Sequence, residues 1–283
     1  MADQYFTEQQ TPYLRLGVRV TAQLHEEQTE YQRLRIYDTT DLGRLLVLDD
    51  IIQLTTSDEF TYHEMVAHVP LAIHPDPQDA LVIGGGDGGV VREALRHPTI
   101  QRVHLVDIDE AVVRTAKEFF PTVSSGYADP RATISIADGI AHVRDNPAAY
   151  DAVLIDSTDP IGPAVGLFRA DFYRSVNRSL RDRGVFSQQI GSPFYNAAFI
   201  RQTIAAAREA FDVVRVYTGV VPTYPGGLWC YLLGLKGDLG TMPADPARAE
   251  QVSGQYYSPA VHRAAFALPP FVAALATNGP DAG

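Results

Sequence analysis

Acidic side chains follow several short apolar runs of this sequence, at positions where they could bind cations or accept protons. Asp156 and Asp159 lie three residues apart in a segment that also contains two prolines and a glycine. This spacing is typical of a shaped loop that covers a site, although a turn rich in aspartate and proline is the structural alternative. A carboxylate in such a loop can bind an ammonium group, and it can take a proton as a general base. Three more acids occupy comparable places, namely Asp87, Asp107 and Asp138.

A glycine-rich segment surrounds the first of these acids. Residues 84–89 read Gly-Gly-Gly-Asp-Gly-Gly, which fits the pattern G-x-G-x-x-G. Glycines allow a sharp turn and the close approach of a ligand, so Gly84 and Gly86 are candidate ligand contacts. Glycine-rich turns also serve packing, and the motif alone is a weak signal. Its place between a predicted strand and a predicted helix strengthens it.

The acids after the next strands fit a nucleoside-type ligand. Asp107 follows the second strand of the series, where a carboxylate can accept hydrogen bonds from both hydroxyls of a ribose. Asp109 is expected to cap the next helix. Asp138 and Gly139 follow the third strand, where a short acid either reaches an adenine amino group or caps a helix, and the sequence does not separate these roles. Acids follow four predicted strands, and turns alone do not readily explain this pattern.

The charge of Asp87 distinguishes between two classes of enzyme that share a glycine-rich loop after the first strand. A dinucleotide-dependent dehydrogenase would hold a pyrophosphate in the glycine loop, and Asp87 would repel it. An S-adenosyl ligand carries no phosphate, and its sulfonium is a cation. Asp87 would also repel the amino-acid carboxylate of intact S-adenosylmethionine, but it would attract the bare amine of the decarboxylated form. The acids together favour a cationic adenosyl donor and a cationic acceptor.

Alternating strands and helices are predicted to position these residues. Five short apolar runs separated by helical segments predict an α/β fold with a doubly wound parallel sheet, which binds ligands beyond the carboxyl ends of its strands. Two later runs, 213–219 and 228–235, are typical of an antiparallel pair at the sheet edge. The expected strands are Ala80–Ile83, Val103–Val106, Thr133–Ile136, Ala152–Ile155 and Gly184–Gln188, and the expected helices are Gly89–Arg96, Glu110–Phe119, Ile140–Arg144, Ala170–Leu180 and Ala197–Phe211.

The first part of the chain has a different pattern. Residues 1–55 alternate apolar and polar side chains between turn signals, and we expect a small antiparallel β domain of hairpins there. Thr56 and Glu59 fit a capping box, which predicts a helix that runs to about Ile73. Residues 56–283 are expected to form the catalytic domain, with a mostly helical segment over 259–276 and a frayed tail after it.

The composition limits the classes of function. The 283 residues carry a formal net charge of −11, which argues against nucleic acid as the main partner. No apolar run reaches membrane-spanning length and no secretory signal is visible, so a cytoplasmic protein without a membrane partner is expected. The single cysteine, Cys230, lies in an apolar run typical of a core. The eight histidines show no metal-binding spacing, and no metal is expected.

Several longer blocks of the sequence resemble the polyamine aminopropyltransferase family, and within it the bacterial spermidine synthases most closely. The blocks are Tyr62–Met65, Gly84–Gly89, Asp156–Pro163, Pro222–Pro225 and Tyr256–Phe266, and they occur in the same order. The likeness extends over most of the chain. It implies a small N-terminal antiparallel β domain on a Rossmann-like domain of the S-adenosylmethionine methyltransferase type, which agrees with the elements above.

The resemblance also implies a reaction and the residues for it. Members of the family transfer the 3-aminopropyl group of decarboxylated S-adenosylmethionine to putrescine, which gives spermidine and methylthioadenosine. The donor is a co-substrate, so no cofactor is implied, and a homodimer or homotetramer is expected. Asp156 matches the catalytic base, and the diamine contacts match Tyr62, Asp156, Ser157, Asp159 and Tyr224. The donor contacts match Gln32, His63, Gly84, Gly86, Asp87, Asp107, Asp138 and Gly139.

Alternatives to this interpretation differ in the acceptor, the transferred group or the presence of activity. Cadaverine, agmatine or spermidine could replace putrescine, because they share its reacting amine. A diamine N-methyltransferase would keep the fold and use intact S-adenosylmethionine, which Asp87 disfavours. A homologue that only binds polyamine or nucleoside is the non-enzymatic alternative, and the complete set of acids argues against it. The second ammonium of the acceptor has three candidate partners, Glu8, Asp159 and Trp229, and glycines 162 and 166 are candidate hinges of a closing loop.

Overall fold

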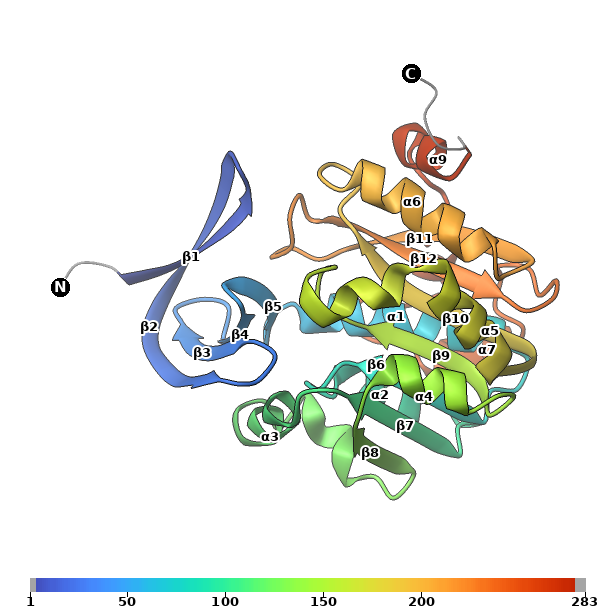
Figure 1. Cartoon of the computed structure of the whole chain (residues 1–283), viewed down its shortest axis with the longest axis horizontal. Coiled ribbons are helices and arrows are strands. Elements are labelled where there is room, and N and C mark those ends of the chain that lie inside the picture. The colour runs from blue at the N-terminus through green and yellow to red at the C-terminus, as the bar shows by residue number, and fades with distance from the viewer. Residues whose placement is uncertain (1–3, 278–283) are drawn as a thin grey trace.

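The computed structural model describes residues 4–277, and its first part is a five-stranded antiparallel sheet of hairpins (Figure 1). The strands lie side by side in chain order, and Asp49 and Asp50 form the turn between the last two, with φ of 47° and 67°. Positive φ at both positions suits the twist of a two-residue hairpin. The predicted sheet of hairpins is confirmed. Its strands are β1(Gln4–Thr11), β2(Leu14–Gln28), β3(Arg33–Thr39), β4(Arg44–Leu48) and β5(Ile51–Thr55).

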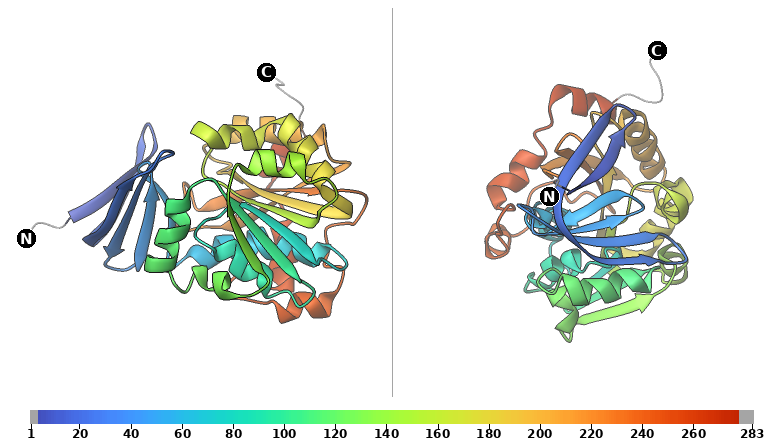
Figure 2. Two further views of the ribbon diagram at one scale, coloured as in Figure 1. Left: turned by 60° about the horizontal axis from the view of Figure 1, so that its bottom comes forward. Right: turned by 90° about the vertical axis from the view of Figure 1, so that its left-hand side faces the viewer.

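Apolar side chains attach this sheet to the rest of the molecule. Leu34 and Ile36 pack against Val112 and Phe120, which follow in the second part of the chain. The opposite face of the sheet carries a separate cluster around Leu45. In the right-hand view of Figure 2 the sheet lies in front of the second part. Burial of apolar surface at this contact fixes the sheet beside the second part.

A seven-stranded sheet forms the second part, and most of its strands run parallel. The order is β11-β12-β10-β9-β6-β7-β8, with β12 antiparallel to both of its neighbours. The order reverses between β6 and β9, which is where ligands bind in such sheets. The predicted α/β fold and its antiparallel edge pair are confirmed. The strands are β6(Asp79–Gly84), β7(Arg102–Asp107), β8(Ala132–Ile136), β9(Tyr150–Asp156), β10(Leu180–Gly191), β11(Val213–Val220) and β12(Leu228–Leu235).

Helices cover both faces of this sheet (Figure 2). The core on one face includes Met65 and Val91, and the core on the other includes Phe172 and Ile200. Cys230 of β12 is fully buried in the second core, as expected. Strands between two such layers need no polar face, which explains their continuous apolar runs. The helices are α1(Glu59–Ile73), α2(Gly89–Leu95), α3(Glu110–Phe119), α4(Gly139–Asp145), α5(Ala170–Ser179), α6(Ala197–Arg208), α7(Pro246–Gln251), α8(Pro259–Ala265) and α9(Pro270–Thr277), with the 3-10 helices η1(Ser124–Ala128) and η2(Gly162–Phe168).

Helix α1 begins at a different residue from the one that the predicted capping box implies. Glu59 is the first helical residue, Asp58 is the N-cap, and the Asp58 side chain makes no capping hydrogen bond. The Thr56 hydroxyl instead accepts a hydrogen bond from the Arg44 amide at 3.0 Å, because the chain turns once more after β5. The capping box of Thr56 and Glu59 is therefore wrong, whereas the end of the helix at Ile73 is confirmed.

The C-terminal segment is helical but interrupted. The helix expected over residues 259–276 consists of α8 and α9, with a break before Pro270. Within residues 4–277 no single helix is long and apolar enough to cross a membrane, and α8 with α9 satisfies such a test only as a pair bent by 63°. The tail expected over 278–283 lies outside the described residues.

Candidate active site

A cavity of about 230 Å³ is lined by residues of both sheets, at the carboxyl ends of β6, β7 and β9. The N-terminal sheet contributes Glu8 and Leu48 to its wall. The structure brings together every residue that the sequence selects for donor, acceptor or catalysis. These residues are Gln32, Tyr62, His63, Gly84, Gly86, Asp87, Asp107, Asp138, Gly139, Asp156, Ser157, Asp159 and Tyr224.

The glycine loop after β6 lets three strand ends approach one another. Gly84 and Gly85 have positive φ, 73° and 66°. A Cβ on Gly84 would lie 2.2 Å from the backbone oxygen of Asp156, and one on Gly86 would lie 2.7 Å from a carboxylate oxygen of Asp107. Larger residues here would push the two acids away, so the glycines serve the packing of the site itself. This role is compatible with the close approach of a ligand.

The acids that follow β7 and β8 are held in different ways. Asp107 accepts hydrogen bonds from the amides of Gly86 at 2.9 Å and Asp109 at 2.8 Å. Burial raises the pKa of Asp107 to about 6. Asp138 is exposed and accepts a hydrogen bond from the Ile140 amide at 2.8 Å, so it caps α4 while it lines the cavity. Its contact with an adenine stays a prediction.

Asp109 and Gln32 connect the N-terminal sheet to this edge. Asp109 caps α3 as predicted, by accepting a hydrogen bond from the Ala111 amide at 3.0 Å. Its other carboxylate oxygen accepts hydrogen bonds from Gln32 Nε2 at 2.9 Å and from the Thr29 hydroxyl at 2.8 Å. Asp109, the N-cap of α3 in the second part of the chain, therefore holds the Gln32 side chain at the cavity wall.

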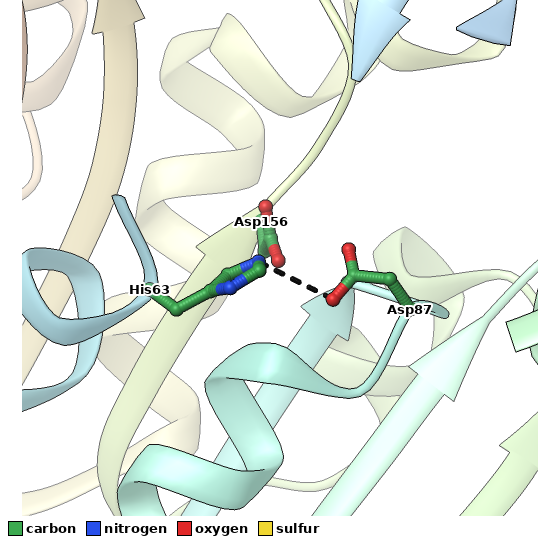
Figure 3. A group of neighbouring side chains, drawn as sticks. All are labelled: His63, Asp87 and Asp156. Atoms are coloured by element: carbon green, nitrogen blue, oxygen red, sulfur yellow. Dashed lines mark ion pairs between the residues drawn. The ribbon is translucent and has the colours of Figure 1, made fainter. Parts of the chain in front are cut away.

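His63, Asp87 and Asp156 form the charged centre of the cavity (Figure 3). His63 Nε2 lies 3.2 Å from Asp87 Oδ1, and His63 Nδ1 lies 2.5 Å from Glu59 Oε2. Asp87 Oδ1 also accepts a hydrogen bond from the Gly89 amide at 2.7 Å. Burial lowers the pKa of His63, but the two carboxylates outweigh it and hold that pKa well above its ordinary value.

The same three side chains have a spacing that a metal ion could use. One ligand atom from each of His63, Asp87 and Asp156 lies within 4.8 Å of the others. The spacing of histidines along the chain cannot reveal such a group, because its members come from α1, the glycine loop and β9. That no metal is required for the reaction stays a prediction.

Asp156 has an unusual affinity for a proton. Burial raises its pKa to about 7, and the charge of Asp87 adds to the rise. Asp156 Oδ2 is buried and has no hydrogen-bond partner within residues 4–277, and the same holds for Ser157 Oγ. Buried polar atoms without a partner are costly, which indicates that a ligand supplies the missing hydrogen bonds. Asp156 is thus suited to bind a donor group and to take its proton near neutral pH.

Aromatic rings line the cavity next to Asp156. The ring centres of Tyr62 and Tyr224 lie 5.8 Å apart, and those of Tyr224 and Trp229 lie 4.8 Å apart. The Tyr224 hydroxyl donates a hydrogen bond to the backbone oxygen of Gln53 at 2.5 Å. Trp229 is buried in the core and also reaches the cavity wall. These rings can flank an alkyl chain or face a cation.

Two further acids face this part of the cavity. Burial raises the pKa of Asp159. Burial also raises the pKa of Glu8, to about 7, and the charge of Asp159 adds to this rise. The Glu8 carboxylate accepts a hydrogen bond from the Ile52 amide at 3.4 Å. A cation placed between Glu8 and Asp159 would relieve their repulsion.

Glu59 and Tyr127 contact residues of the site, and the sequence does not select either of them for this place. Glu59 contacts His63 four residues later on α1, a spacing that places two side chains on one helix face and could have revealed it. The Tyr127 hydroxyl donates a hydrogen bond to the Gly86 backbone oxygen at 2.9 Å. No local pattern marks Tyr127, because η1 brings it there from outside the strand ends.

Comparison with known proteins gives matches over nearly the whole chain. A family model described as the spermine/spermidine synthase domain matches residues 59–240, and one described as the spermidine synthase tetramerisation domain matches residues 4–56. A polyamine aminopropyltransferase of Moorella thermoacetica is 53 % identical over 268 residues, which cover 95 % of this chain and 94 % of the relative. Another from Caldicellulosiruptor bescii is 44 % identical, with 95 % and 96 % covered.

Solved structures agree with these relatives. A spermidine synthase in complex with the transition-state analogue AdoDATO has a TM-score of 0.93 and 37 % identity, with 96 % of this chain and 94 % of that chain covered. The spermidine synthase of Thermotoga maritima has a TM-score of 0.90 and 36 % identity over the same shares. Because the first family model covers more than half of the chain and the relatives match nearly all of it, the chain belongs to the spermine/spermidine synthase family and is a polyamine aminopropyltransferase.

Proposed function

We propose that this enzyme transfers the 3-aminopropyl group of decarboxylated S-adenosylmethionine to putrescine, giving spermidine and methylthioadenosine. The observation that carries the proposal is the buried, unpartnered carboxylate oxygen of Asp156, which lies beside both Asp87 and Tyr62. A cationic donor and a cationic diamine both suit such surroundings. The solved relative bound to AdoDATO, a spermidine synthase with a transition-state analogue, supports the same reaction.

The donor occupies the edge formed by β6, β7 and β8 in this proposal. Asp107 accepts hydrogen bonds from the ribose hydroxyls, and Asp138 with Gly139 contacts the adenine. Asp87 binds the amine, and it would repel the carboxylate that intact S-adenosylmethionine carries next to that amine. The other donor contacts in the proposal are Gln32, His63, Gly84 and Gly86.

The acceptor lies among the aromatic rings. Tyr62 and Tyr224 flank its methylene chain, while Asp156 and Ser157 receive the reacting amine. The second ammonium belongs between Asp159 and Glu8, since their mutual repulsion is highest without a cation. A diamine therefore suits the cavity better than an amine with a single charge.

The reaction forms one C–N bond and breaks one C–S bond. The amine lone pair attacks the methylene carbon beside the sulfonium, and the C–S electrons go to sulfur, which leaves as a neutral thioether. An alkylammonium with a pKa of about 10.4 must lose a proton to react. Asp156 accepts this proton. Alignment of both substrates contributes more to the rate than the base does. The leaving group is neutral and needs no Lewis acid, and we propose that no metal takes part.

The enzyme is a homo-oligomer in this proposal, a dimer or a tetramer. The match of residues 4–56 to a tetramerisation domain supports it. A cytoplasmic location stays a prediction from the sequence.

A competition assay tests the reaction and the acceptor together. The enzyme receives decarboxylated S-adenosylmethionine with equal amounts of putrescine, cadaverine, agmatine and spermidine, and the products are identified by mass. We expect spermidine and methylthioadenosine to dominate. A dominant product of another amine would replace putrescine as the acceptor, and methylated amine formed from intact S-adenosylmethionine would favour an N-methyltransferase. No methylthioadenosine with any amine would contradict aminopropyl transfer.

A further inference from the structure

Glu59 is a buried acid that the proposed reaction does not use. Its side chain is 9 % exposed, and its Oε2 lies 2.5 Å from His63 Nδ1. Arg92 donates hydrogen bonds to both Glu59 oxygens, at 3.0 and 2.9 Å. His63 Nε2 in turn lies 3.2 Å from Asp87 Oδ1, as Figure 3 shows. Arg92, Glu59, His63 and Asp87 therefore form a row of charged groups that ends in the cavity.

The His63 ring is held in one orientation. The residue is 2 % exposed. A Cβ on Gly89 would lie 2.2 Å from His63 Nδ1, so the ring fills space that only glycine leaves open at the start of α2. In this orientation each ring nitrogen faces a carboxylate oxygen. A neutral imidazole has one donor nitrogen and one acceptor nitrogen, so only the imidazolium can donate to both carboxylates.

The charge of His63 matters for Asp87 and Asp156. Their nearest oxygens and a His63 nitrogen all lie within 4.8 Å of one another. Two carboxylates at this separation repel, and such a pair tends to retain a shared proton. A cation in contact with one of them makes that proton easier to lose. With the imidazolium present, Asp87 stays an anion and Asp156 is free to accept the proton of the amine.

We propose that Glu59 is a positioning residue that, held by Arg92, keeps His63 in its cationic form and so prevents Asp87 and Asp156 from trapping a shared proton. The consequence for the rate rests on the proposed function, because it uses Asp156 as the base. The charge of His63 does not depend on which amine the enzyme accepts. Glu59 acts only through His63.

The other titratable groups around His63 cannot replace Glu59. Tyr62 and Tyr224 are uncharged near neutral pH, since the ordinary tyrosine pKa is about 10 and burial raises the pKa of both further. Arg92 is a cation, and it would repel the imidazolium if Glu59 were neutral. The groups of the described residues that face His63 or its two acids are Tyr62 and Glu59 from α1, Asp87 from the glycine loop, Arg92 from α2, Asp107 from β7, Tyr127 from η1, Asp156 from β9, Tyr224 from the β11–β12 connection and Tyr231 from β12.

Nuclear magnetic resonance of the full-length enzyme without substrates tests the charge directly. Histidine ring ¹⁵N shifts are recorded from about pH 6 to about pH 9, around the ordinary histidine pKa of about 6.5. The His63 signals are assigned by their loss in His63→Gln. We expect both ring nitrogens to keep imidazolium shifts at about pH 8 in the wild type. In Glu59→Gln they should change to those of a neutral tautomer. A neutral His63 in the wild type at about pH 7 would overturn the proposal.

Kinetics then tests the consequence for the reaction. In Glu59→Gln we expect the acidic limb of kcat/KM for the amine to move to higher pH by about one unit or more, because the two acids hold their proton more tightly. Glu59→Asp keeps the charge and should reverse part of the shift. Glu93→Gln is the matched control, since Glu93 also accepts a hydrogen bond from Arg92, at 2.7 Å, but its other partners are His68 and Arg96.

The outcomes separate this proposal from a structural role and from the proposed function. A lower kcat in Glu59→Gln with an unmoved limb, or an equal shift in Glu93→Gln, would contradict the positioning role. Thermal unfolding shows whether each variant folds, and the wild-type resonance experiment decides the charge of His63 even if Glu59→Gln does not fold. If no amine gives a product, the proposed function fails, while the resonance result still stands.

Discussion

At the scale of single residues, the proposed role of Asp156 requires its carboxylate to bind an ammonium group and also to take a proton from it. A carboxylate beside an ammonium stabilises the charged amine, which raises the cost of deprotonating it. Burial and the neighbouring Asp87 offset this cost, because they raise the pKa of Asp156 to about 7 and make it a better proton acceptor. The pKa of Asp156 is still lower than that of an alkylammonium, about 10.4. Alignment of the substrates in the cavity has to compensate for this difference in pKa.

Replacing Asp156 by asparagine removes the base and keeps the shape. We expect Asp156→Asn to lower kcat by about 10²- to 10⁴-fold, the usual contribution of a general base. Methylthioadenosine release at saturating concentrations of both substrates measures it. Asp145→Asn, at an exposed acid of α4, is the control. Turnover within about threefold of the wild type in Asp156→Asn would exclude the assigned base.

The raised pKa of Asp156 predicts a pH dependence. Below its pKa the side chain is protonated and cannot accept a proton, so kcat/KM for the amine should fall as the pH drops through about 7. The residual activity of Asp156→Asn should lack this limb. Glu8 has a similar pKa of about 7, so Glu8→Gln is measured beside it and should keep the limb. A limb that persists in Asp156→Asn would assign it to another group.

The grouping of His63, Asp87 and Asp156 makes metal removal a useful experiment. We expect dialysis against a chelator to leave turnover unchanged, because a neutral thioether leaves without help from a Lewis acid. Activity before and after dialysis, with total metal measured on the same samples, checks this. Loss of activity that zinc restores would show that the three side chains hold a catalytic ion.

At the scale of elements, the site depends on how closely α1 and the glycine loop approach each other. The strand-end acids could be predicted from the sequence, because parallel strands end at one edge of the sheet, where ligands bind. Asp138 shows the limit of this reasoning, since one side chain both caps a helix and lines the cavity. Capping depends on the residues that follow Asp138 in the chain, so the local sequence can predict it. Lining the cavity depends on other elements, which the local sequence does not show.

The start of α1 and the contact of Glu59 with Arg92 on α2 could not be predicted as they occur. The pattern of a capping box is local, but the N-cap is Asp58 rather than Thr56, so the helix begins two residues later, and the Thr56 hydroxyl bonds to β4 instead. Glu59 is then free to meet His63 on its own helix and Arg92 on the next one. Contacts between elements of this kind leave no periodic signal in the sequence.

The segment after Asp156 is predicted to close over bound ligand. Ile161 is 57 % exposed, and a side chain at Gly162 would meet no atom within 4 Å, which leaves this end free to move. Gly166, the other candidate hinge, packs against Ile140, so movement is expected mainly at Gly162. We expect methylthioadenosine to slow proteolysis between residues 157 and 165. Unchanged cleavage at saturating ligand would contradict closure.

At the scale of the whole molecule, the proposed acceptor site includes residues of both sheets. The predicted boundary after residue 55 falls at the end of β5, yet Glu8 of β1 shares the cavity with Asp159 of the second part. The N-terminal sheet, whose match to a tetramerisation domain supports the proposed homo-oligomer, therefore also shapes the cavity.

Neutralising Glu8 should weaken binding of the diamine alone. A hydrogen bond to a charged group contributes about 1.5–3 kcal/mol, so Glu8→Gln should raise KM for putrescine by about 10- to 100-fold. The KM of the donor should not change, because Glu8 is not among the proposed donor contacts. Glu26→Gln, at an exposed acid of β2, is the control. An equal rise for both substrates would mean that the sheet has been disturbed as a whole.

Because Cys230 is buried, its reaction with a thiol reagent can report the opening of the sheet around β12. This single thiol lies on β12, a strand paired on both sides, and none of its surface is exposed. A thiol reagent can reach it only when β12 separates from β10 or β11, or when the helices above it lift. The rate of labelling thus measures how often this part of the seven-stranded sheet opens, without an engineered cysteine. Because the neighbouring Trp229 lines the cavity, slower labelling with bound ligand would show that the occupied cavity holds β12 in place.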